Sequence, residues 1–138
     1  MKRIILAIFG FIAASLTYGQ PVFNALSGPT GGNIIQIERT SGNKLFALTT
    51  RALYESTNSG NDWAKNAAIE AAATNFSNEG VTGLYIDNAD KIYVATKSKI
   101  YKSSDAGVTW TSVTGTGVYN PSRRLLKNET TGSLYVLG

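Results

Sequence analysis

The amino-acid sequence predicts an all-β fold made of repeated units, each a meander of four short antiparallel strands. Three observations carry this prediction: a segment that recurs without a gap, runs of β-branched and aromatic residues, and polar turns between these runs. The segment KLFALTTRALYESTNSGNDW, from Lys44 to Trp63, aligns with KIYVATKSKIYKSSDAGVTW, from Lys91 to Trp110, at a constant offset of 47 residues. Identical residues recur in register at Lys44/Lys91, Tyr54/Tyr101, Ser56/Ser103, Gly60/Gly107 and Trp63/Trp110.

Residues 1–19 have the order of regions that is typical of a secretory signal peptide. Two basic residues precede an apolar run that ends at Leu16, and the small residues Thr17 and Gly19 suit a signal peptidase site. A membrane anchor is the alternative, but a spanning helix needs about 20 apolar residues and this run is shorter. We expect cleavage before Gln20 and a secreted, periplasmic or cell-surface protein without a stable membrane span. Residues 20–30 are expected to form an N-terminal linker.

Composition narrows the chemistry that the mature chain can carry. The whole chain has 13 basic and 9 acidic residues, and loss of Lys2 and Arg3 with the signal peptide leaves 11 basic residues and a net charge of +2. No basic run survives, so nucleic acid is not an expected partner. The absence of cysteine and histidine excludes a Ser-His-Asp triad, a Cys-His pair and a His- or Cys-ligated zinc site. We expect no metal site, no cofactor and a core held without disulfides.

The repeat divides the rest of the chain into two units and the start of a third. The first unit covers about residues 31–66, the second about 81–114, and the third begins at about 123–138. In the second unit the pattern predicts strands over Val81 to Ile86, Lys91 to Thr96, Lys99 to Ser103 and Thr109 to Val113. The intervening segment from Ala67 to Gly80 is interpreted as a long loop, although its alanines would also suit one or two helical turns.

A short motif at the end of the second unit points to a known family. Ser103, Asp105, Gly107, Thr109 and Trp110 fit the pattern S-x-D-x-G-x-T-W, and the first unit carries a degenerate copy at Ser56, Asn58, Gly60 and Trp63. Over residues 31–138 the chain resembles the Asp-box (BNR) repeat β-propellers, which include sialidase-like, photosystem-assembly-factor-like and sortilin-type members. The resemblance implies four-stranded propeller blades, of which about two and a half are present.

Propellers close with 4 to 8 blades, so further blades are expected beyond those in this sequence. Two arrangements would supply them: a longer secreted chain of which this is the N-terminal piece, which we favour, or association with other copies. A blade needs neighbours on both sides to bury its faces.

The motif predicts turn chemistry rather than catalysis for Asp105. An aspartate in such a turn accepts hydrogen bonds from backbone N–H groups, Gly107 supplies a left-handed dihedral angle, and Trp110 has a large surface to bury. Asn58 keeps the acceptor oxygen without the charge, which a turn tolerates and a catalytic carboxylate would not. Asp87 and Asp90 are likewise interpreted as turn residues rather than as an acid and base pair.

Two functional hypotheses follow. The leading one is a secreted, non-catalytic propeller module that binds a glycan or protein partner; the alternative is the N-terminal part of a sialidase-like or xyloglucanase-like glycoside hydrolase. Arg39, Arg51, Arg123 and Arg124 would suit a carboxylate-gripping cluster, but solvated loop arginines are the simpler interpretation. We expect a ligand to bind on the face that carries the loops between the second and third strands of each unit. The alternative is that these loops only connect strands. The candidate binding residues are Arg51, Lys97, Phe76, Tyr119 and Arg123.

Overall fold

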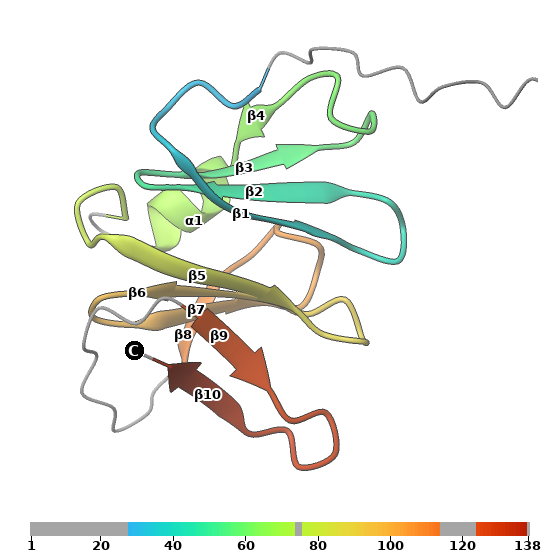
Figure 1. The fold of residues 1–138 in the computed structure, drawn as a ribbon, viewed down its shortest axis with the longest axis vertical. Helices are drawn as coiled ribbons and strands as arrows, with labels where there is room; N and C mark the ends of the chain where they lie inside the picture. The colour runs from blue at the N-terminus through green and yellow to red at the C-terminus, as the bar shows by residue number, and fades with distance from the viewer. Residues whose placement is uncertain (1–27, 74–75, 114–123, 138) are drawn as a thin grey trace, which may run out of the picture.

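The computed structural model describes residues 28–73, 76–113 and 124–137, and in these ranges the chain forms ten strands and one short helix (Figure 1). The strands form two four-stranded sheets and one two-stranded sheet, all antiparallel. The first unit contains β1 (Ile34–Arg39), β2 (Leu45–Thr49), β3 (Leu53–Ser56) and β4 (Ala64–Lys65); the second contains β5 (Val81–Ile86), β6 (Ile92–Thr96), β7 (Ile100–Ser103) and β8 (Thr111–Val113); the third contains β9 (Arg124–Lys127) and β10 (Leu134–Leu137).

Each four-stranded sheet is a simple meander in which every strand pairs with the next one along the chain. The predicted all-β fold and its four-stranded antiparallel units are therefore confirmed. The last two strands of the second unit begin later than expected, at Ile100 and Thr111, because the preceding residues belong to the turns. None of the sheets in the described ranges closes on itself.

The backbone of the first unit recurs in the second at the offset seen in the sequence. The strands begin at 34, 45, 53 and 64 in the first unit and at 81, 92, 100 and 111 in the second, a difference of 47 each time. The register irregularity in the first strand also recurs, between Ile34 and Gln36 and between Val81 and Gly83. Left-handed backbone angles recur as well, at Asn43/Asp90, Ser59/Ala106 and Gly60/Gly107.

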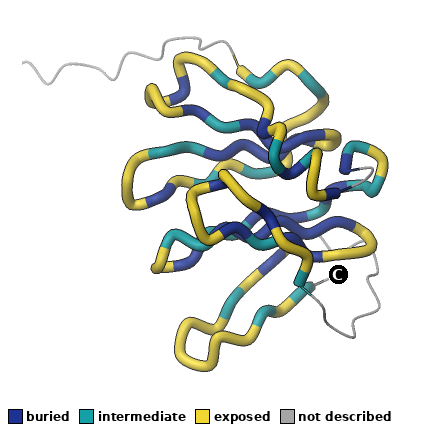
Figure 2. The backbone as a smooth tube through the Cα atoms, turned by 180° about the vertical axis from the view of Figure 1, so that it is seen from behind, coloured by how far each residue is buried: buried dark blue, intermediate teal, exposed yellow. Residues whose placement is uncertain are grey.

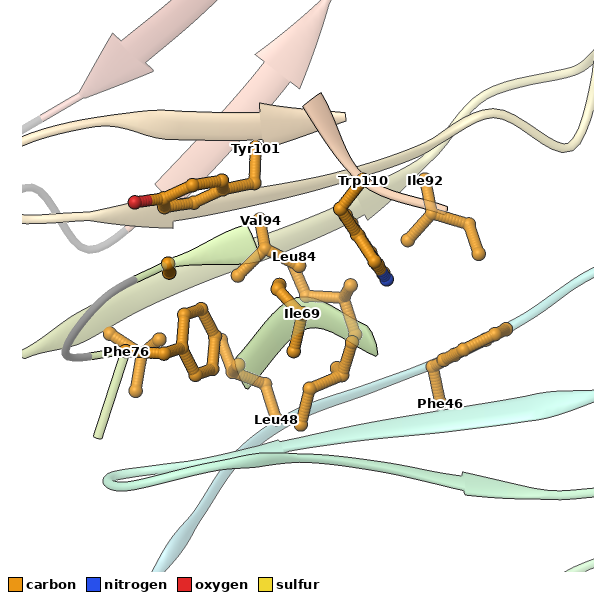
Figure 3. Close-up of a cluster of buried hydrophobic side chains, with 12 residues drawn as sticks. Phe46, Leu48, Ile69, Phe76, Leu84, Ile92, Val94, Tyr101 and Trp110 are labelled. Atoms are coloured by element: carbon orange, nitrogen blue, oxygen red, sulfur yellow. The ribbon is translucent and has the colours of Figure 1, made fainter. Parts of the chain in front are cut away.

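The sheets stack on one another and bury the main core between the first two (Figure 1). Phe46 and Leu48 of the first sheet point toward Ile92, Val94 and Trp110 of the second (Figure 3). A smaller cluster lies between the second and third units and contains Tyr93, Ala95, Ile100 and Leu125. Strand β1 lies beside β5, and β5 beside β9. Each interface therefore uses one face of a sheet, as the alternation of apolar residues along strands allows.

The segment between the first two units is not simply a loop, and this part of the sequence interpretation was wrong. Residues Ala67–Ala72 form the helix α1, and Asn66 caps it by accepting a hydrogen bond from the backbone N–H of Ile69 at 2.9 Å. Alanine has the highest helix propensity and asparagine is a favoured N-cap, which explains the helix locally. Ile69 and Ala73 then pack into the core between the two sheets.

Phe76 also departs from the expectation of an exposed loop residue available to a ligand. Its side chain is fully buried and meets the ring of Tyr101 edge-on, with 6.2 Å between the ring centroids (Figure 3). Helix α1 ends at Ala72, and Phe76, beyond it, packs into the same core cluster as Ile69 and Ala73. Phe76 therefore stabilises the contact between the units and is removed from the candidate ligand-binding residues.

Candidate functional site

The turn after β7 is held by the side chains of the predicted motif. The Asp105 carboxylate accepts hydrogen bonds from the Thr109 backbone N–H at 2.8 Å, from the Ser103 hydroxyl at 2.8 Å and from the Thr109 hydroxyl. The Ser103 hydroxyl in turn accepts from the backbone N–H of Gly107 at 2.9 Å, and Gly107 has a φ of 87°. The carboxylate of Asp105 is therefore engaged by its own turn.

These hydrogen bonds also set the ionisation of Asp105. The Thr109 hydroxyl, the Thr109 amide and the Ser103 hydroxyl favour the charged carboxylate and lower its pKa to about 2. A carboxylate with this pKa is a poor general acid or base near neutral pH, where such groups work best with a pKa close to the ambient pH. The geometry supports a structural role.

The first unit makes the same turn, but its carboxylate belongs to Asp62, the counterpart of Thr109, and not to the counterpart of Asp105. Asn58 accepts from the Ser56 hydroxyl at 3.0 Å and from the Asp62 backbone N–H at 2.9 Å, as Asp105 does with Ser103 and Thr109. Its amide nitrogen donates to the Asp62 carboxylate at 2.7 Å, whereas in the second unit the hydroxyl of Thr109 donates to Asp105. Gly60 again bonds to the serine hydroxyl. The degenerate motif therefore exchanges donor and acceptor and keeps the turn.

Trp110 joins this turn to the first unit. The residue is only 7% exposed, and its indole nitrogen donates to the Asn66 side chain at 3.2 Å and to the Gly107 carbonyl at 3.1 Å. The amide nitrogen of Asn66 donates to the Gly107 carbonyl at 2.9 Å and to the Glu55 carboxylate at 2.7 Å. Asn66 escaped the sequence analysis, although its position directly before an alanine-rich run is a recognisable N-cap signal.

Asp87 and Asp90 face different partners and do not form a pair of catalytic carboxylates. The Asp87 side chain is fully buried and accepts from the Lys127 ammonium at 2.7 Å and from the Tyr93 hydroxyl at 3.3 Å. Burial disfavours its charge, but hydrogen bonds from Lys127 and from the backbone amides of Lys91 and Ala89 outweigh this and lower the pKa. Asp90 accepts from the hydroxyl and the amide of Ser41, and these bonds lower its pKa too. Asp87 therefore links the second unit to the third, and Asp90 links the second unit to the first.

The opposite ends of the sheets carry the hairpins on which ligand binding was expected. We call the β2–β3 hairpin (residues 49–52) and the β6–β7 hairpin (residues 96–99) the loop edge; they lie on the left in Figure 1, away from the β1–β2 and β5–β6 turns. The two hairpins are built alike. Thr49 donates to the Ala52 carbonyl at 3.0 Å and accepts from the Ala52 amide at 3.0 Å, and Thr96 makes the same pair of bonds with Lys99 at 3.1 and 3.0 Å.

This construction presents cations to solvent from both tips. Arg51 in the first hairpin and Lys97 and Lys99 in the second are exposed, as are the hydroxyl-bearing residues Thr50 and Ser98. Figure 2 colours the backbone by this degree of exposure. Because the threonine hydrogen bonds fix the backbone of each hairpin, the backbone positions from which these side chains project are fixed as well. Exposed polar groups on fixed loops are the usual carriers of binding.

Glu79 lies beside the second hairpin of the loop edge and was missed by the sequence analysis. Its carboxylate accepts from the hydroxyls of Thr96 at 2.9 Å, Ser98 at 3.2 Å and Tyr101 at 3.4 Å. Burial, followed by the nearby Glu79 charge, raises the pKa of Tyr101. Three hydroxyl donors satisfy the carboxylate, so Glu79 orders the second hairpin from the side. No local sequence pattern links it to residues 17 to 22 positions later.

The other predicted residues are distributed as follows. Tyr119 and Arg123 lie outside the described residues. Arg39 lies at the end of β1, across the sheet from Arg51, and donates to the Asn43 side chain at 3.3 Å. These two arginines therefore do not converge. Within the described ranges, no group of three or more acidic, histidine or cysteine residues is placed to hold a metal ion, and no helix has the length and hydropathy to cross a membrane.

Comparison with known proteins adds no assignment. No family model matches the chain, and no curated protein matches it.

Proposed function

We propose that this chain is part of an exported β-propeller of the Asp-box type whose loop edge binds an acidic glycan without catalysis. The observation that carries the binding role is the repetition of one hairpin design in two successive units, with one exposed cation at the first tip and two at the second. Stacked four-stranded meanders with a 47-residue repeat support the propeller, since blades repeat at this length.

The composition of the loop edge favours a glycan over a peptide. Burial of Phe76 removes one of the two aromatic side chains that a peptide or a neutral sugar could pack against, and the other, Tyr119, lies outside the described residues. The exposed hairpin residues are cations and hydroxyls, namely Arg51, Lys97, Lys99, Thr50 and Ser98. Guanidinium and ammonium groups pair with carboxylates and sulfates, and hydroxyls add hydrogen bonds to sugar oxygens. Uronic acid or sulfated polysaccharides match this chemistry.

A titration of the exported chain with an acidic oligosaccharide tests the proposal. Arg51→Ala, Lys97→Ala and Lys99→Ala should each weaken binding by about twofold to fivefold, as expected for exposed charge pairs, and added salt should weaken it further. Lys91→Ala is the matched control, because Lys91 precedes β6 at its opposite end from Lys97.

Unchanged binding in all three hairpin variants would contradict the assignment. Loss of binding only in variants of the Asp-box turns would also contradict it. Binding to acidic peptides but not to acidic oligosaccharides would replace the glycan by a protein partner.

A further inference from the structure

We propose that the second hairpin of the loop edge selects uronic acids over sulfate esters, because Glu79 makes the Ser98 hydroxyl an acceptor for the hydroxyl groups of a sugar. This inference rests on the proposed function and narrows its ligand class, since the exposed cations alone suit a uronate and a sulfated sugar equally. Three observations carry it: the hydrogen bonds of Glu79, the path of the Lys97 side chain and the difference between the two hairpins.

The Glu79 carboxylate is held in place from inside the protein. The hydroxyl of Tyr101, whose side chain is buried, lies 3.4 Å from each of its oxygens. The hydroxyl of Thr96, which is also buried, donates to it at 2.9 Å. Glu79 itself is half-buried, and its outer side meets the exposed Ser98. A fixed negative charge therefore lies directly beside the tip of the second hairpin.

This carboxylate determines how the Ser98 hydroxyl bonds to a ligand. The Ser98 Oγ lies 3.2 Å from the Glu79 Oε2, and because an ionised carboxylate only accepts hydrogen bonds, the serine donates its single proton to Glu79. The other hydroxyl nearby, that of Thr96, is 3.5 Å away. The Ser98 oxygen keeps its lone pairs, so it meets a ligand as an acceptor. Its complement is a hydroxyl donor and not the oxygen of an anion.

Lys97 supplies a cation next to this acceptor. Its backbone N–H donates to the Gly80 carbonyl at 3.0 Å. A Cβ at Gly80 would lie 2.9 Å from the Cε and 3.0 Å from the Cδ of Lys97, so the stem of Lys97 crosses closely over this glycine. Lys97 and Ser98 therefore both lie against the segment of Glu79 and Gly80. The ammonium group pairs with a carboxylate while Ser98 accepts from a hydroxyl of the same sugar chain.

The first hairpin lacks this arrangement. The offset of 47 residues places Gly32 at the position of Glu79 and Arg51 at the position of Ser98. In the part of the chain that the structure describes, a carboxylate bonds to the tip of the second hairpin but not to that of the first. The first tip therefore attracts any anion through Arg51, and discrimination between anions belongs to the second tip.

A sulfate ester is disfavoured at the second tip for two reasons. It takes the place of a sugar hydroxyl, so Ser98 loses its donor. It also brings negative oxygens toward the lone pairs of Ser98 and the charge of Glu79, and such repulsion is a common source of specificity. A uronate avoids both effects, because its charge and its hydroxyl groups lie on different carbons.

Calorimetric titration of the exported chain with two matched ligands tests the proposal: an oligogalacturonate, and the same oligosaccharide with its hydroxyls converted to sulfate esters. Attraction between charges alone would favour the sulfated form, which carries more charge. We expect the native chain to bind the unsulfated form more tightly, by about threefold or more. Ser98→Ala should weaken binding of the unsulfated form by about twofold to tenfold and leave the sulfated form unchanged, whereas Ser98→Thr should keep the preference.

Glu79→Gln tests the role of the charge at nearly constant size. Its amide group donates as well as accepts, which frees the Ser98 proton for an anion. We expect affinity for the sulfated ligand to rise by about twofold to fivefold. Glu129→Gln is the matched control, because it removes the same charge from the β9–β10 hairpin, at the opposite end of the sheets from the loop edge (Figure 1). It should leave the ratio of the two affinities unchanged.

Circular dichroism and melting curves establish that each variant is folded; if Glu79→Gln is not, the two Ser98 variants decide alone. Tighter native binding of the sulfated form, or a preference that survives in Ser98→Ala or in folded Glu79→Gln, would overturn the inference. Arg51→Ala separates this failure from that of the proposed function. If it weakens binding of both ligands while the preference is absent, acidic glycan binding stands and only the selection is wrong; if neither ligand binds the native chain, both fail.

Discussion

The indole nitrogen of Trp110 donates a hydrogen bond of 3.2 Å to the side chain of Asn66, and this bond links the turn after β7 to the end of the first sheet. Asn66 also caps α1 and bonds to the Gly107 carbonyl. The buried side-chain amide of Asn66 thus forms hydrogen bonds with the N-terminal end of α1, with the turn at Gly107 and with Trp110. The strength of this junction can be measured directly.

Replacement of Asn66 by alanine should destabilise the fold by about 2 to 3 kcal/mol, because it removes a helix cap and leaves buried polar groups without a partner. Chemical denaturation gives the free energy of unfolding. Asn88→Ala, in the exposed turn after β5, is the control and should change it little. Equal effects of the two substitutions would contradict the role given to Asn66.

Gly107 and Gly132 both have left-handed backbone angles, and alanine substitutions there can distinguish the cost of backbone strain from the cost of steric contact. Gly107 has a φ of 87° and Gly132 a φ of 73°. A Cβ at Gly107 would lie 3.0 Å from the Phe46 ring and 3.1 Å from the Asn66 amide nitrogen, whereas a Cβ at Gly132 would meet nothing within 4 Å. Gly132→Ala should cost about 1 to 2 kcal/mol from backbone strain alone, and Gly107→Ala about 2 to 4 kcal/mol.

Thermal unfolding of both glycine variants checks this difference. If Gly132→Ala is as damaging as Gly107→Ala, the contact with Phe46 and Asn66 adds nothing to the strain.

The two equivalent tryptophans should respond differently to truncation. Trp110 is buried between two sheets, whereas Trp63 is half-buried beside Tyr54, on the side of the first sheet that faces away from the second. Trp110→Ala should cost about 3 to 5 kcal/mol and Trp63→Ala about 1 to 2 kcal/mol. Acrylamide should quench the fluorescence of Trp63 more strongly than that of Trp110 in the respective single-tryptophan variants. Equal quenching would contradict this difference in burial.

The depressed pKa of Asp105 predicts a loss of stability in acid. In the folded protein its pKa is about 2, below the ordinary value of 3.8, so the folded state binds the proton less readily than the unfolded state. The contribution of Asp105 is therefore fully present above pH 4 and is lost as the pH falls toward 2. Asp105→Asn should reduce the difference between the melting temperatures at these two pH values.

Asp87 and Asp90 also have lowered pKa values and add to the loss of stability in acid. The effect of Asp105 is therefore the difference between the acid profiles of the variant and the native protein. The double variant Asp105→Asn with Thr109→Asp recreates the arrangement of Asn58 and Asp62 and should recover stability at neutral pH. An acid profile of Asp105→Asn identical to that of the native chain would contradict the assignment of the low pKa.

The sequence was informative wherever a structural signal is local. The run of β-branched and aromatic residues from Ile92 to Thr96 predicted a strand, and the spacing of Ser103, Asp105 and Gly107 predicted a turn, because neighbouring residues alone determine both. Phe76 was misplaced because its neighbours along the chain are polar while its partners, such as Tyr101, belong to another element. The pairing of Asp87 with Lys127 likewise depends on how two units stack, which no short pattern encodes.

Helix α1 has only six residues, and its cap is also a bonding partner of the second sheet. Isolated helices shorter than about 12 residues are marginal in water, so α1 depends on the sheets that enclose Ile69. We therefore expect α1 to form late in folding, after residues more than 40 positions apart have met. The first two units then unfold as a single cooperative block, with no stable intermediate in which one unit is folded and the other is not.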